Sequence, residues 1–150
     1  VMDSVLGGAL TGYPLIGVKA TLKDLKFDEE NSAELAYTIA ASMAFKEACT
    51  KAGISLMEPM MNLEILTPVE NTGDIISDLN QKRGRIVSID SKGEREIIKA
   101  EAPLSNMFGY TTQLRSRSQG RASFTMSFKN YEKLENNLAK QILEKRGIFI

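Results

Sequence analysis

The sequence predicts an α+β protein whose larger part is a four-stranded antiparallel sheet with two helices on one face. Between residues 60 and 128, patterns of period two and period 3.6 follow the order strand, helix, strand, strand, helix, strand. Two glycines and an arginine recur 36 positions apart, Gly73, Gly84 and Arg85 as Gly109, Gly120 and Arg121. Two split β-α-β units of this kind, connected with right-handed crossovers, form a ferredoxin-like sandwich.

The beginning of the chain is predicted to be helical and then extended. Residues 1–10 resemble the end of a helix that stops at Gly7 and Gly8, without a capping residue at its start. We therefore expect the chain to be a C-terminal piece of a longer protein, although a processed natural N-terminus is an alternative. The alternation over Ile16–Leu22 predicts a strand.

A long helix is predicted to follow this strand. Asn31 and Glu34 match a capping box, and the helix is expected to run to about Ala52, with Gly53 as its left-handed end. Every fourth residue from Ala36 to Ala48 is alanine, which would let the helix lie close to a sheet. Its apolar ridge is Leu35, Ile39 and Met43.

The first half of the repeat contains a strand over Met61–Ile65 and then a helix. Thr67 is the expected N-cap, Pro68 the first-turn residue and Glu70 the capping glutamate, and Gly84 ends the helix. The residues expected to face inward are Ile75, Ile76 and Leu79.

A strand over Ile86–Ile89 completes the first half, and a turn at residues 91–93 joins it to a strand over Glu96–Ala102, which begins the second half. A helix over residues 104–117 is expected to bury Met107, Phe108, Thr111 and Leu114. The last strand alternates Ala122, Phe124, Met126 and Phe128 with Ser123, Thr125 and Ser127. Residues 131–146 predict a further amphipathic helix.

The distribution of charge indicates two domains and one basic surface. The 19 basic and 19 acidic residues cancel, but residues 1–59 hold five lysines and eight acids, whereas residues 60–150 hold fourteen basic residues and eleven acids. With a boundary at the Glu58-Pro59 step, the predicted domains are residues 1–59 and 60–150, the second with its core at 60–128. Residues 102–131 contain no acid.

Basic residues lie at equivalent ends of the two predicted helices, Lys82, Arg83 and Arg85 in the first half and Arg115, Arg117 and Arg121 in the second. Together they predict a patch that binds nucleic-acid phosphates. The alternative is that these arginines only complement the helix dipoles. Ser116, Ser118 and Gln119 are expected to add hydrogen-bond donors.

Stacking of bases on the sheet is not predicted. Phe124 and Phe128 share the face that the helices should cover, and the opposite face offers Ser123, Thr125 and Ser127, which cannot stack. Any contact with RNA should therefore come from helix ends and loops.

Several classes of function are excluded by composition. The chain has no histidine and one cysteine, Cys49, so it lacks an internal disulfide, a zinc site and any histidine-based catalysis. It also lacks the lysine-containing loop that binds nucleotide phosphates. Asp28, Glu29 and Glu30 are expected to be a solvated loop before a helix. Without a signal peptide or an apolar run of membrane length, we expect a cytoplasmic protein with no membrane partner.

Several segments resemble the translation elongation factor G family, and the resemblance covers nearly the whole chain. The segments are Gly12–Pro14, Ala44–Ala48, Leu56–Met61, Thr72–Asn80, Arg83–Gly84, Ala102–Tyr110, Leu114–Ser116 and Gln119–Arg121. The resemblance implies the C-terminal half of domain IV, which is part of an S5-like α/β domain, followed by the ferredoxin-like domain V.

This resemblance implies the ribosome-binding part of a GTPase that promotes translocation of tRNA and mRNA. The fragment itself would have no catalytic residue and no cofactor, whereas GTP and Mg²⁺ would belong to the full-length protein. A monomer is expected, with domain V binding the sarcin–ricin loop and stalk-base rRNA. The implied contact residues are Phe108, Gly109, Tyr110, Arg115, Ser116, Arg117, Gln119, Arg121, Arg83 and Arg85.

The tip of domain IV is implied to approach the decoding region and tRNA through Lys26, Phe27, Asp28 and Glu29. Asp28 stands where the family commonly has a histidine, and a carboxylate near phosphates is unfavourable. A paralogue specialised in ribosome recycling is therefore an alternative. An alternative of another class is a ferredoxin-like regulatory module that binds a small ligand.

Overall fold

The chain is described by a computed structural model over residues 1–8, 11–27, 33–145 and 147. It divides into two compact units, one formed by Val1–Ser55 with Glu135–Ile150 and the other by Leu56–Leu134. No helix in these described ranges is both long enough and apolar enough to cross a membrane.

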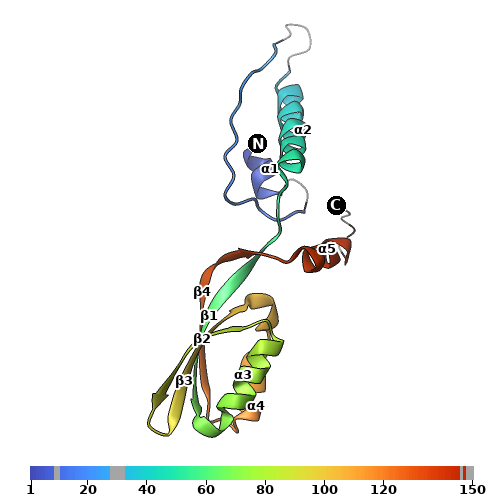
Figure 1. The fold of residues 1–150 in the computed structure, drawn as a ribbon. Coiled ribbons are helices and arrows are strands. Elements are labelled where there is room, and N and C mark those ends of the chain that lie inside the picture. The colour runs from blue at the N-terminus through green and yellow to red at the C-terminus, as the bar shows by residue number, and fades with distance from the viewer. Residues whose placement is uncertain (9–10, 28–32, 146, 148–150) are drawn as a thin grey trace. The chain divides into compact units, whose positions relative to one another are not determined.

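The second unit is the predicted split β-α-β sandwich. Its elements are β1 (Met57–Pro68), α3 (Thr72–Gln81), β2 (Arg85–Lys92), β3 (Arg95–Pro103), α4 (Tyr110–Arg117) and β4 (Ser123–Lys133). The strand order is β2-β3-β1-β4, with every neighbouring pair antiparallel. Both helices lie on the same face of the sheet (Figure 1). The predicted fold class is confirmed.

The core of this unit lies between the sheet and the two helices. Leu63 and Ile65 of β1 and Ile98 of β3 are buried beneath Ile75 and Leu79 of α3, as the pattern predicts. Full burial of each such side chain contributes about 1.5–3 kcal/mol to folding. The hydrophobic contacts therefore hold α3 and α4 on the sheet and determine where the remaining side chains of the two helices are presented.

The helix α3 begins later than predicted. Thr67 is fully buried in β1 opposite Glu96, so it is part of the sheet and not an N-cap. A short 3-10 helix, Val69–Asn71, separates the strand from α3, and Asn71 is the residue that precedes the helix. The ladder with β3 continues as far as Pro68 and outweighs the local capping signal.

The second predicted helix is interrupted. Leu104–Asn106 forms a 3-10 turn, and α4 begins only at Tyr110 because Gly109 has a left-handed φ of 74°. Met107 and Leu114 are buried as expected. The expectation is wrong for Phe108 and Thr111, which are exposed, and Tyr110 lies inward instead.

The strand β4 is only partly covered. Phe124 packs edge-on against Tyr110 with ring centroids 5.1 Å apart, but Phe128 is 54% exposed. The pairing with β1 shifts between Met60 and Met61, and this irregularity brings the rings of Phe128 and Tyr131 to 5.2 Å. Phe128 does lie opposite the buried Met61, but the expectation that helices cover it is wrong.

The first unit contains α1 (Met2–Leu6), α2 (Glu34–Ala52) and α5 (Asn136–Lys145). Phe45 and Cys49 of α2 form a small core with Val5, Leu15 and Ile54. Gly53 ends α2 with φ 73°, as predicted. The helix α5 begins at Asn136, later than residue 131, because β4 extends to Lys133.

Three expectations for the first unit are not met. The segment Ile16–Leu22 is not a strand, since no described segment pairs with it. The helix α2 begins at Glu34 after Ala33, without a side-chain cap, while Asn31 lies outside the described residues. The ridge expected to be buried is exposed, because no described sheet covers Leu35, Ile39 and Met43.

Candidate nucleic-acid interface

The helix α4 and the residues just before it expose an aromatic side chain and a cation. Tyr110, Leu114 and Ser118 are buried at a spacing of four residues, so the positions between them face solvent. Phe108 is 76% exposed just before the helix, and Arg115 is exposed in its last turn. The helix and the residues before it therefore offer a ring for stacking and a guanidinium for hydrogen bonding to an anion.

The C-terminal end of α4 is fixed by internal hydrogen bonds. The Ser118 hydroxyl donates to Leu114 O at 2.7 Å and accepts from Ala122 N at 3.1 Å. Ser118 is therefore not the phosphate donor that the sequence suggested, because it is buried and both bonds are internal. The backbone N–H of Gly120 donates to Arg115 O at 2.8 Å, with Gln119 at φ 52°.

The end of α3 has the same construction. Gly84 N–H donates to Leu79 O at 2.7 Å, and the left-handed residue before it is Arg83, with φ 61°. A Cβ on Gly84 would lie 2.7 Å from Leu79 O, which is too close for an unstrained backbone. Gly84 and Gly120, which are equivalent in the 36-residue repeat, thus mark the ends of α3 and α4, and each end presents basic residues.

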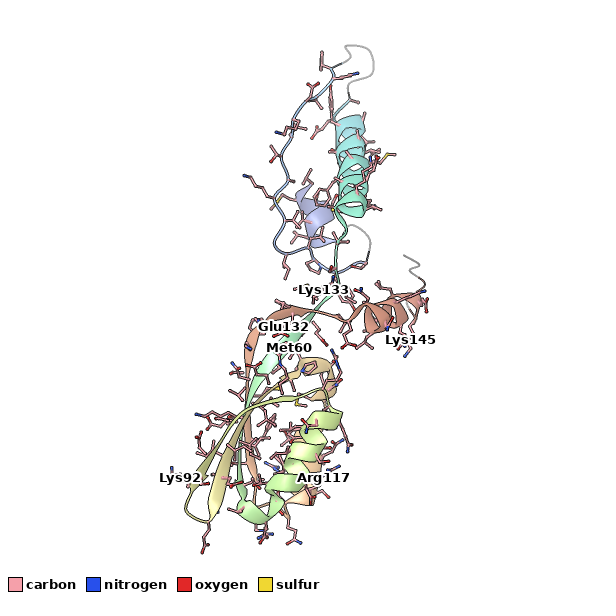
Figure 2. The ribbon with its side chains drawn as sticks, viewed as in Figure 1. Met60, Lys92, Arg117, Glu132, Lys133 and Lys145 are labelled. Carbon is pink, nitrogen blue, oxygen red and sulfur yellow. The ribbon has the colours of Figure 1, made fainter. Side chains whose placement is uncertain are left out.

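The basic residues do not form one free patch. Arg117 Nη2 lies 3.2 Å from Asp78 Oδ1, and Arg121 Nη2 lies 2.6 Å from Glu70 Oε1. Arg115 is different, since none of the acidic residues in the described ranges forms an ion pair with it. Figure 2 shows Arg117 at the end of α4, on the other side of the view from Lys92 of β2.

The arginines of the first repeat half are bound to carboxylates. Arg83 forms a two-pronged pair with Glu58, with N–O distances of 3.0 and 2.5 Å. Arg85 Nη2 lies 2.9 Å from Glu101 and 2.8 Å from Glu132. A phosphate would have to compete with these carboxylates for either guanidinium.

The carboxylate of Glu101 joins three strands. Lys129 Nζ of β4 lies 2.6 Å from its Oε1, and Arg85 of β2 binds its Oε2. The hydrogen bond from Lys129 is the main reason that the pKa of Glu101 lies below its usual value, and the bond from Arg85 acts in the same direction. These charges therefore tie the sheet together.

Residues 102–131 contain no acidic residue, but acidic side chains from other parts of the chain lie beside their basic residues. The carboxylates that meet Arg117, Arg121 and Lys129 come from Asp78, Glu70 and Glu101, all outside residues 102–131. Local composition does not contain this information. One signal was available, since the repeat places Asp78 at the position of the inward-facing Leu114.

The remaining implied contact residues lie on α4 and in the segments that flank it. Gly109, Ser116 and Gln119 are exposed, whereas Tyr110 is buried and its hydroxyl has no hydrogen-bond partner in the described part of the chain. Burial raises the pKa of Tyr110, so it stays neutral at ordinary pH. Tyr110 therefore anchors the start of α4 in the core, and its contact with RNA stays a prediction.

At the predicted tip, Lys26 and Phe27 are exposed, while Asp28 and Glu29 lie outside the described residues. Within the described ranges, no group of three or more histidine, cysteine, aspartate or glutamate side chains is placed to hold a metal ion.

Comparisons with known proteins match both parts of the chain. The family described as "Elongation factor G, domain IV" matches residues 1–53, and "Elongation factor G C-terminus" matches residues 55–142. "Elongation factor G" of Neorickettsia sennetsu (strain ATCC VR-367 / Miyayama) is 49% identical over 139 residues, which are 93% of this chain and 20% of that protein.

A crystal structure of a protein from Thermus thermophilus superposes with a TM-score of 0.84 at 34% identity, covering 97% of this chain and 22% of that one. The chain therefore spans about a fifth of the length of these relatives. Its sandwich and its sequence matches are those of translation elongation factors. The chain belongs to the elongation factor G family.

Proposed function

We propose that this chain is the ribosome-binding C-terminal region of a translational GTPase that promotes movement of tRNA and mRNA. The family membership and the length of its relatives support this proposal. GTP and Mg²⁺ would bind in another part of a longer protein, because the printed sequence lacks a phosphate-binding loop. In this view the chain contributes binding and mechanical coupling, without catalytic residues.

The observation on which the proposal chiefly rests is the unpaired Arg115 on the exposed face of α4 in the described part of the chain. A guanidinium that is not engaged by a carboxylate can bind a phosphate without losing an existing ion pair. Phe108, exposed just before α4, offers a stacking surface for an unpaired base. Looped rRNA, such as the sarcin–ricin loop or the stalk base, presents both phosphates and unstacked bases.

The other implied residues have secondary places in this interface. Ser116, Gln119 and Gly109 are exposed in or beside α4, whereas Arg83, Arg85 and Arg121 are engaged by carboxylates. We propose that these three arginines contribute mainly to the positive electrostatic potential of this surface. Lys26 and Phe27 would contact the decoding region or tRNA, together with Asp28 and Glu29.

The test is the variant Arg115→Glu in the intact factor, with ribosome binding measured over a range of salt concentrations. We expect affinity to fall about 10- to 100-fold, since a charged hydrogen bond is worth about 1.5–3 kcal/mol. The slope of log affinity against log salt should also fall by about 0.7–0.9 for each lost phosphate contact.

The matched control is Arg95→Glu, which makes the same charge change at the start of β3 opposite Lys92. Arg95 is exposed and forms no ion pair within the described ranges. Affinity and slope should stay near the wild-type values in this variant. Equal losses in both variants, or no loss in either, would refute the proposed contact.

A role in ribosome recycling is the second candidate, and the acidic Asp28 favours it. A carboxylate near phosphates weakens contact with the tRNA–mRNA duplex. Asp28→His should increase the rate of translocation relative to the rate of subunit splitting if the protein is specialised for recycling. An unchanged ratio of the two rates would remove this candidate.

A further inference from the structure

A buried carboxylate lies between the two helices of the second unit. Asp78 of α3 is 5% exposed, and its ion pair in the described part of the chain is with Arg117 of α4, whose Nη2 is 3.2 Å from Asp78 Oδ1. The side chain of Arg117 is itself half exposed. One end of this ion pair is therefore in the interior and the other is at the surface.

Because the carboxylate of Asp78 is buried, it needs Arg117 as its ion-pair partner. A buried charge is costly unless it is paired, and removing one partner leaves the other unsatisfied. The nearby Tyr110 hydroxyl does not compensate, since it forms no hydrogen bond in the described part of the chain. Turning Arg117 toward a phosphate would thus leave Asp78 without its cation.

We propose that Arg117 is a positioning residue and not an RNA contact: its ion pair with Asp78 holds α4 against α3 and fixes the direction in which Phe108 and Arg115 face solvent. The effect of Arg117 on ribosome binding rests on the proposed function. The contact between α3 and α4 does not depend on it. Arg115 and Arg117 belong to one basic cluster by sequence, but in the described part of the chain only Arg117 forms an ion pair.

The first experiment compares Arg117→Gln with Arg115→Gln in the intact factor by salt-dependent ribosome binding. Arg117→Gln should raise Kd about fivefold with an unchanged salt slope, because no phosphate contact is lost. Arg115→Gln should raise Kd and lower the slope by about 0.7–0.9. The double variant Asp78→Asn with Arg117→Gln should regain most of the affinity, because no buried charge remains unpaired.

Two results would overturn the proposal. A reduced slope in Arg117→Gln would show that Arg117 binds phosphate directly. An unchanged Kd at temperatures well below unfolding would show that the ion pair contributes to stability alone.

The second experiment measures amide hydrogen exchange in the same factor without ribosomes. In Arg117→Gln, the amides of Tyr110–Arg117 should exchange about tenfold faster, while those of β1 and β3 are unchanged, and the double variant should restore protection. Equal protection of α4 in the wild type and Arg117→Gln would refute the inference. Faster exchange together with undetectable ribosome binding by every protein would refute the proposed function and support the role of Arg117 within the unit.

Discussion

The helices α3 and α4 occupy equivalent places in the two halves of the repeat, but they turn different faces toward the sheet. Leu79 of α3 is 0% exposed, whereas the residue 36 positions later is the exposed Arg115. Asp78 and its equivalent Leu114 are both buried. Because successive residues are about 100° apart around a helix, α4 is turned by about one residue relative to α3.

The entry into each helix explains the difference. Gly73 lies inside α3, which begins at Thr72, while its equivalent Gly109 has a left-handed φ of 74° and precedes α4. The 3-10 turn before α4 ends with Met107 buried and Phe108 outside. A repeated glycine can therefore act as a helix residue in one half and as a helix boundary in the other.

The largest effect expected from this comparison is on stability. Leu79→Ala should lower the free energy of unfolding by about 2–5 kcal/mol, because it leaves a cavity in the core. Arg115→Ala, at the equivalent position, should change it by less than about 0.5 kcal/mol, because the side chain is in solvent. Urea denaturation of both variants measures the difference, and similar losses would show that the helices bury the same face.

Smaller changes in stability, of opposite sign, are expected when the equivalent glycines Gly73 and Gly109 are replaced by alanine. Gly109→Ala should destabilise the protein by about 1–2 kcal/mol, because an L side chain is strained at φ 74°. Gly73→Ala should stabilise it by up to about 1 kcal/mol, because this helical glycine has open space where a Cβ would lie. Thermal denaturation compares the two, and a gain from Gly109→Ala would contradict the left-handed entry into α4.

The smallest effect concerns pH and the ion pairs of Glu101, which connect strands from both halves of the repeat. Hydrogen bonds from Lys129 and then Arg85 hold the pKa of Glu101 below its usual value of 4.5. The ionised carboxylate therefore stabilises the folded state above about pH 4.5, and this contribution is lost as pH falls through the lowered pKa. Unfolding free energies between about pH 5 and 3 should fall less steeply in Glu101→Gln than in the wild type. Identical slopes would exclude this linkage.

Much of the sandwich could be predicted from local patterns. The alternation in β1 and the period of α3 indicate which side chains face the core, because a strand or helix repeats its direction at a fixed spacing. The glycine at the end of α3 is also readable, since few other residues permit the close approach of Gly84 to Leu79. These features depend on residues that are near one another in the chain.

The first unit shows where such patterns are insufficient. Ile16–Leu22 alternates like a strand, but a strand requires a partner, and the described ranges contain none for it. The apolar ridge that includes Ile39 is exposed for the same reason, because burial depends on a covering surface. Periodicity gives the direction of a side chain and does not supply what it packs against.

The candidate site shows the same division. The amino-acid order alone places the site at the helix ends of the repeat, with Arg115 and Arg117 two positions apart. It also excludes catalysis by histidine, because the sequence contains none. Only the folded structure shows which of the two arginines lacks an ion pair in the described ranges. The partner of Arg117 is Asp78, which is 39 residues earlier in the chain and lies on another helix. Coulomb attraction depends on distance in space, and that distance is set by how α3 and α4 pack on the sheet.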